Sequence, residues 1–109
     1  MRLDKIVKEL GLEVLTERDI EKEVKGVYIG DLLSLVMANA SENNLWITIQ
    51  THLNIIAVAT LVGLSAILIA EGMEVEDETI KKANEVKIPI LRSKLSAYEL
   101  ACRLYELGV

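Results

Sequence analysis

The sequence predicts an α/β fold with three layers, α/β/α, in which helices cover both faces of a small, mostly parallel sheet. From Val24 onward, a segment typical of a strand followed by a segment typical of a helix occurs four times. Because a whole helix stands between successive strands and the loops are short, parallel pairing through right-handed crossovers is expected. Residues 65–70 have the pattern of a continuous apolar strand, which is typical of a strand covered on both faces.

The chain of 109 residues is interpreted as one domain, with a core over residues 24–108 and an N-terminal extension over residues 1–23. A helix is predicted over residues 3–10, with Gly11 as a suitable stop. Residues 12–15 alternate in polarity and predict a short strand. The apolar residues of the first helix recur at the spacing of one helical face: Leu3, Ile6, Val7 and Leu10.

The middle of the chain predicts two strands, each followed by a helix. Residues 24–29 are rich in Val, Ile and Tyr and predict a strand, and Asp31 is a suitable N-cap for the helix that follows. Residues 45–49 predict the next strand. The helix predicted over residues 54–61 is apolar on nearly every side, so we expect it to be well buried, and Gly63 should end it.

The last third of the chain predicts a more exposed helix, a short strand and a final helix. The exposed helix is expected at Asp77–Val86. The strand over residues 88–91 contains Pro89, which lacks an amide hydrogen, so we expect it at an edge of the sheet. Ser96 and Glu99 have the spacing of a capping box and predict the start of the final helix.

Composition excludes several classes of protein. The formal net charge is −5 and the longest basic feature is Lys81-Lys82, which disfavours binding to nucleic acids. Hydrophobic residues make up 51% of the chain, which excludes disorder. Cys102 is the only cysteine, so no disulfide can form within the chain, and a reducing, cytoplasmic compartment is expected.

Residues 43–70 contain no Asp, Glu, Lys or Arg and raise the question of a membrane span. Several polar residues interrupt this stretch, and Gly63 divides its second half. A buried strand, helix and strand therefore explain it better than a membrane-spanning helix, which needs about 18 or more consecutive apolar residues. No membrane association is expected.

Polar residues gather where the predicted strands end, which is where ligands bind in open parallel sheets. The densest group lies between two apolar segments, where polar groups are costly unless they find partners. The helix that follows also offers free backbone amides to an anion. We therefore predict a ligand-binding or interaction site formed by Gly30, Asp31, Thr48, Gln50, Thr51, His52 and Asn54.

Structural roles are an alternative explanation for the same residues. Asp31, Thr51 or Asn54 would then cap helices, while Gln50 and His52 would satisfy loop backbone groups. An acid–base pair of Asp31 and His52 is a further possibility, which requires the two side chains to converge in a pocket. The single histidine and single cysteine give no ligand set for a metal.

No catalytic or cofactor signature stands in the sequence. The phosphate-binding loop, the dinucleotide-binding glycine motif, the zinc-protease motif and the nucleophile elbow are all missing. The cofactor, if there is one, is left open. Cys102 lies beside the apolar face of the last predicted helix and is expected to be a small core residue.

Four stretches resemble the DRTGG domain, a small module found on regulated enzymes. They are VYIGDLLS at 27–34, WITIQTHLNIIAVA at 46–59, IPIL at 88–91 and SAYELA at 96–101. The resemblance covers residues 24–108 and implies a fold like the N-terminal domain of HPr kinase/phosphorylase. The nucleotide-binding machinery of that kinase belongs to its other domain, so kinase activity is not implied. Where relatives carry Asp-Arg-Thr-Gly-Gly, this chain has Gln50-Thr51-His52-Leu53-Asn54.

The resemblance and the polar cluster together predict a non-catalytic regulatory module. It would bind a small metabolite, a nucleotide or a partner enzyme at the carboxyl ends of the strands. A homodimer is expected, because a small and strongly apolar domain tends to have a face to cover. Two rival hypotheses are a small enzyme that uses Asp31 and His52, and a purely structural interaction subunit.

Overall fold

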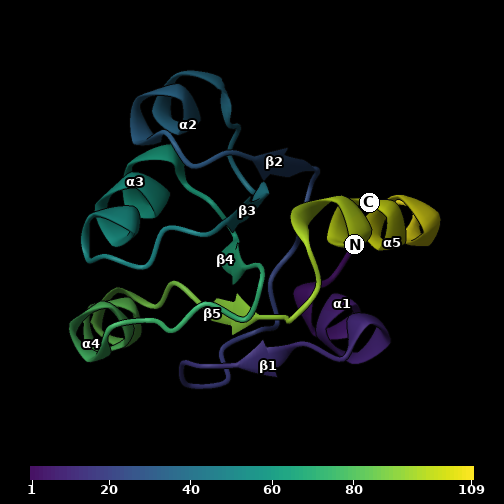
Figure 1. Cartoon of the computed structure of the whole chain (residues 1–109), viewed down its shortest axis with the longest axis horizontal. Helices are drawn as coiled ribbons and strands as arrows, with labels where there is room; N and C mark the ends of the chain where they lie inside the picture. The colour runs from purple at the N-terminus through teal and green to yellow at the C-terminus, as the bar shows by residue number, and fades with distance from the viewer.

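The computed structural model describes all residues of the chain, 1–109, as five helices and five strands (Figure 1). In chain order these are α1 (Leu3–Leu10), β1 (Glu13–Val14), β2 (Val27–Ile29), α2 (Leu33–Asn39), β3 (Leu45–Thr48), α3 (Asn54–Val62), β4 (Ala66–Ile69), α4 (Asp77–Val86), β5 (Ile90–Arg92) and α5 (Ala97–Leu107).

The strands form one sheet in the order β1-β5-β4-β3-β2. β2, β3, β4 and β5 are mutually parallel, and only β1 is antiparallel, where Glu13 lies opposite Arg92. The four parallel strands follow one another in sequence order, as expected when each is joined to the next by one helix. The mostly parallel sheet predicted from the sequence is confirmed.

Two groups of helices cover the two faces of this sheet. α2, α3 and α4 lie on one side and α1 and α5 on the other, which makes three layers (Figure 1). Alternate strand residues supply the two cores: Leu45, Ile47 and Leu68 face α1 and α5, while Trp46 and Ile67 face α2, α3 and α4. The sheet is therefore buried on both faces, which explains the continuous apolar run of β4.

The expected position of β5 at a sheet edge is wrong, because β5 lies between β4 and β1. Pro89 stands just before the strand, where its carbonyl still accepts a bond from the Ile67 amide at 3.0 Å. The first amide of the strand, that of Ile90, is bonded to the Thr16 hydroxyl at 3.1 Å. The missing amide hydrogen of Pro89 thus costs the sheet no bond.

β2 and α3 also differ from the sequence prediction. β2 begins only at Val27, because Gly26 turns the chain with a φ of 87° and Val24 instead donates its amide to the Met1 carbonyl at 2.7 Å. α3 is buried on one side but exposes Leu61 at 74%, so it is not covered all round. No helix has the length and apolar character that crossing a membrane requires.

Candidate functional site

Three of the predicted site residues meet at the carboxyl ends of β2 and β3. The Asp31 carboxylate accepts bonds from the Thr48 hydroxyl at 2.8 Å and from the Ile49 amide at 3.0 Å. The Gln50 side-chain amide donates to the Asp31 carbonyl at 2.9 Å, and the Gln50 backbone amide donates to the Thr48 hydroxyl at 3.2 Å. We call Asp31, Thr48 and Gln50 the strand-end network. Gly30 lies beside it and accepts a bond from the Trp46 indole at 2.8 Å.

The expected helix caps are wrong at both helices that follow these strands. The N-cap of α2 is Leu32 and that of α3 is Leu53, and neither helix has a side-chain cap. Asp31 stands one residue too early to cap α2, and its carboxylate is engaged with Thr48 and Ile49 instead. Aspartate is a residue type that often caps helices, and this is what the sequence indicated. Its actual hydrogen-bond partners, Thr48 and Ile49, lie at the end of the neighbouring strand β3.

The other predicted residues lie further along the β3–α3 connection and have separate contacts. The Thr51 carbonyl accepts a bond from the Thr79 hydroxyl of α4 at 2.8 Å. The His52 Nδ1 is paired with the carboxylate of Glu76, just before α4. Asn54 is exposed in the first turn of α3. Asp31 and His52 therefore have different partners, and this structure contains no acid–base pair between them.

The strand-end network leaves no buried polar group unpaired. Every buried side-chain nitrogen and oxygen of the chain has a hydrogen-bond partner, and Asp31 itself is exposed to solvent. Large apolar side chains that flank the network are nevertheless open to solvent: Leu32 is 61% exposed, Leu53 44% and Ile49 43%. An internally satisfied polar centre with an exposed apolar surround is suited to contact with another surface.

A hollow lies at the carboxyl ends of β4 and β5, the next two strands of the sheet after those of the network. The chain leaves β4 toward α4 on one face of the sheet and leaves β5 toward α5 on the other (Figure 1). Such a divergence of neighbouring strands is the topological switch point at which open α/β sheets bind ligands. The hollow has a volume of about 540 Å³ and is lined by Leu10, Gly11, Glu13, Gly72, Glu74, Arg92, Ser93, Lys94, Leu95 and Arg103. We call it the carboxyl-edge hollow.

Hydrogen bonds between the two connecting loops hold this hollow in shape. The Gly72 amide donates to the Ser93 carbonyl at 2.8 Å, and the Glu71 amide donates to the Leu95 carbonyl at 2.9 Å. Arg92 reaches across the same gap and donates to the Met73 carbonyl at 3.3 Å. The rim is therefore preformed rather than dependent on a ligand.

Charges in the carboxyl-edge hollow are unequally paired. Arg92 is bound by Glu13 through contacts of 2.9 to 3.1 Å and lies 3.8 Å from Glu74. Lys94 and Arg103 line the same hollow, and neither makes an ion pair. Two free cations beside a held guanidinium are an arrangement that attracts phosphate or carboxylate groups.

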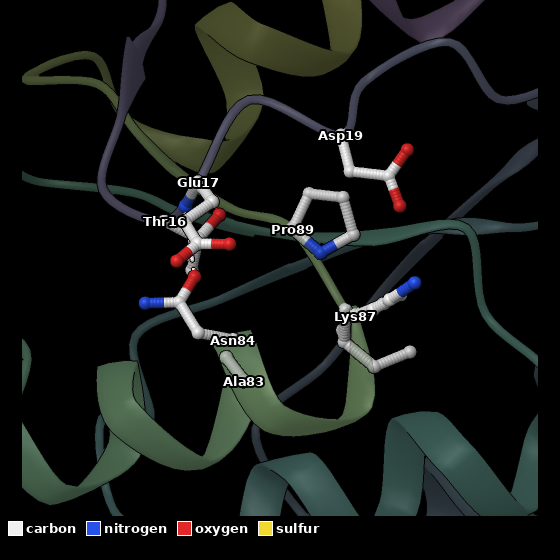
Figure 2. A pocket seen from close by; sticks show the side chains of 8 residues that line it. Thr16, Glu17, Asp19, Ala83, Asn84, Lys87 and Pro89 are labelled. Carbon is white, nitrogen blue, oxygen red and sulfur yellow. Dashed lines mark hydrogen bonds between the residues drawn. The ribbon is translucent and has the colours of Figure 1, made fainter.

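A second hollow, of about 290 Å³, lies at the opposite edge of the sheet, where β5 begins. Figure 2 shows Pro89 at its centre, with Glu17 and Asn84 on one side and Asp19 and Lys87 on the other. The Asn84 carbonyl oxygen accepts the Glu17 amide at 2.8 Å. Its charged side chains are the acidic Glu17 and Asp19 and the basic Lys87, so this hollow does not favour an anionic ligand.

The side chains whose pKa is clearly shifted, such as Lys22 and Asp4, lie outside the carboxyl-edge hollow. Burial lowers the pKa of Lys22, whose amine donates to the Lys87 carbonyl at 2.8 Å. The hydrogen bond from Arg2 lowers the pKa of Asp4 on the exposed face of α1. No group of His, Cys, Asp or Glu side chains is placed to hold a metal ion. Cys102 is half-buried in α5.

Sequence reasoning missed Lys94 and Arg103 as candidate site residues. Arg92 and Ser93 stand at a predicted strand end, so that part of the hollow has a sequence signal. Arg103 lies ten residues further on, in the middle of α5, and only the packing of α5 across the sheet brings it to the hollow.

Comparison with known proteins assigns the family. A model of the DRTGG domain matches residues 5–107. Among solved structures, the chain is similar to the CBS and DRTGG domains of the regulatory region of Clostridium perfringens pyrophosphatase, a crystal structure complexed with the activator diadenosine tetraphosphate. The TM-score is 0.71 at 17% identity, and the match covers 92% of this chain and 44% of that one. This chain thus spans less than half the length of that structure.

No curated protein matches the sequence. The structural similarity shows the fold, and the family model extends over nearly the whole chain, including most of α1. The chain belongs to the DRTGG domain family.

Proposed function

We propose that this domain is a regulatory module without catalysis of its own, which binds a small phosphorylated metabolite or nucleotide in the carboxyl-edge hollow. One observation carries the proposal: Lys94 and Arg103, both without an ion-pair partner, line a preformed hollow of about 540 Å³ at the switch point of the sheet. Ligand sites commonly have volumes of roughly 300–1,000 Å³.

The whole chain has a net negative charge, so a local group of cations stands out as a candidate site for an anion. Lys and Arg number 12 against 17 Asp and Glu, so the net charge of the protein is negative and does not by itself attract an anion. Arg92, Lys94 and Arg103 come from the end of β5, the following loop and α5. Their convergence would concentrate phosphate groups at one edge of the sheet, while the bond network between the loops keeps the entropic cost of binding low.

The solved neighbour supports the choice of ligand class. It is a regulatory region of an enzyme, it contains a DRTGG domain, and its complex holds a nucleotide activator. Adenine nucleotides and diadenosine polyphosphates are therefore the compounds to test here. Their position in the carboxyl-edge hollow is inferred from the cations of this chain.

A binding titration tests the proposal. The protein is titrated with AMP, ADP, ATP, diadenosine tetraphosphate and pyrophosphate, and its melting temperature is followed. A ligand present at a hundred times its dissociation constant adds about 2.7 kcal/mol, which corresponds to a rise of roughly 10 °C in a domain of this size. Lys94→Ala and Arg103→Ala should each weaken binding about tenfold or more, because each removes a charge-assisted bond.

Two further variants make the result specific. Lys81→Ala removes an exposed, unpaired cation on α4 and should leave binding unchanged. Gln50→Ala opens the strand-end network, so a loss of binding in this variant alone would move the site to the residues predicted from the sequence. Equal losses in Lys81→Ala and Lys94→Ala, or no binding across the panel, would contradict a site in the hollow.

Docking to a regulated partner enzyme is the second candidate function. The exposed apolar side chains around the strand-end network, Leu32, Ile49 and Leu53, favour it. The predicted site residues Gly30, Asp31, Thr48, Gln50, Thr51, His52 and Asn54 would then shape a contact surface rather than a pocket. The two functions use different residues of the carboxyl edge, so one domain can perform both.

A further inference from the structure

The outer edge of β2 is open. The Leu45 amide donates to the Gly26 carbonyl at 3.0 Å and the Gly30 amide donates to the Ile47 carbonyl at 3.2 Å, so these two glycines direct backbone groups toward β3. Because backbone groups alternate in direction along a strand, Val27 and Ile29 direct theirs outward. The strand Val27–Ile29 has neither a charged residue nor a proline to block pairing with another strand.

An apolar hollow continues from this edge onto α5. It has a volume of about 250 Å³, and every residue that lines it is hydrophobic: Val27, Ile29, Ala101, Leu104, Tyr105 and Val109. Tyr105 is 82% exposed and Tyr98, two helical turns earlier on the same face, is 78% exposed. Tyrosine is enriched at protein interfaces. In the isolated domain most of the surface of these two side chains contacts solvent and adds little packing to the core.

We propose that a second copy of this chain covers the surface, with the two β2 strands paired antiparallel around a two-fold axis at Tyr28. In this register Val27 of each copy lies opposite Ile29 of the other, and the outward backbone groups of both form four hydrogen bonds. The sheet then continues through both copies. The α5 helices lie on the same face of that sheet and bring the exposed tyrosines together.

Self-complementarity is the reason to assign a second copy rather than a different protein. The same register sets Gly26 opposite Gly30, where no side chain separates the backbones. Each partner of a stable complex buries roughly 800 Å² of its surface. The side chains of Tyr98 and Tyr105 have about 200 Å² of surface each and are mostly exposed, so together they would supply about 300 Å² of that area.

Light scattering on gel-filtered protein at about 50 μM tests the assembly. The unmodified chain should have the mass of a dimer. Ile29→Lys should be monomeric, because each lysine then places a charge in the apolar hollow, beside Val27 of the other copy. Leu61→Lys, at an exposed apolar residue of α3, should remain dimeric. A monomeric parent chain, or a dimeric Ile29→Lys protein with native circular dichroism, would overturn the proposal.

A cross-link tests the register without altering the fold extensively. In a Cys102→Ser background, Tyr28→Cys places one cysteine on the two-fold axis. The two copies of this residue form a non-hydrogen-bonded pair with Cα atoms about 4.5 Å apart, close enough for a disulfide. Mild oxidation should link the copies through residue 28 and leave the Leu61→Cys control unlinked. A dimer that does not link through residue 28 refutes this register.

Discussion

At the scale of single residues, Asp31 shows how a polar side chain near a helix start can have another role. Its carboxylate joins the β2–α2 connection to the end of β3 through Thr48 and Ile49. Hydrogen bonds to a charged acceptor contribute about 1.5–3 kcal/mol each. The network thus holds the carboxyl ends of β2 and β3 together, and we expect it to contribute to the free energy of unfolding.

Thr48→Val should measure this contribution. The Thr48 side chain is buried, and its hydroxyl serves both Asp31 and the Gln50 amide, so its removal leaves two groups with fewer bonds. Chemical denaturation should show a loss of about 1–3 kcal/mol. Thr51→Val is the matched control, because only the backbone carbonyl of Thr51 is hydrogen-bonded. If Thr48→Val and Thr51→Val lower the free energy of unfolding equally, the hydrogen bonds of the network contribute nothing measurable to stability.

At the scale of elements, helices were predicted better than the positions of the strands. α4 has the predicted bounds, Asp77–Val86, and α5 begins after the predicted capping box of Ser96 and Glu99. The position of β5 was not predictable in the same way. Its neighbour β1 precedes it by more than seventy residues, and pairing over that distance leaves no local pattern.

Ser96→Ala should destabilise the domain through the start of α5. The Ser96 hydroxyl accepts the Glu99 amide at 3.2 Å, and the Glu99 carboxylate accepts the Ser96 amide at 3.5 Å. Loss of an N-cap of this type costs about 1 kcal/mol. Urea unfolding of Ser34→Ala, at an exposed position in the first turn of α2 whose hydroxyl makes no hydrogen bond, gives the comparison and should show no loss. An unchanged midpoint for Ser96→Ala would show that packing alone sets where α5 begins.

At the scale of the whole molecule, the candidate site was predictable only as an edge of the sheet. The rule for parallel sheets pointed to the carboxyl ends of the strands, and both the strand-end network and the carboxyl-edge hollow lie there. Which strands form the hollow depends on the faces that α4 and α5 take. The faces on which α4 and α5 pack are set by the complete chain, so no local sequence pattern could identify Lys94 and Arg103 as residues of the hollow.

The same packing bears on the N-terminal segment. α1 covers the sheet face together with α5, and Leu3 and Ile6 are fully buried in the core between them. The Leu3 amide donates to the Lys22 carbonyl at 2.8 Å, which ties α1 to the chain that leads into β2. A segment that shares its core with the last helix should unfold together with it rather than ahead of it.

Ile6→Ala distinguishes these two behaviours. If α1 belongs to the cooperative unit, removal of this buried side chain should lower the free energy of unfolding of the entire domain by about 2–5 kcal/mol. With a urea dependence of roughly 1–3 kcal/mol per molar, the midpoint should fall by about 1–2 M while the transition stays single. Lys5→Ala, one position away on the exposed face of α1, should change the free energy by less than about 0.5 kcal/mol. A near-native midpoint for Ile6→Ala, or an early separate transition, would mean that the remaining sheet and helices are stable without α1.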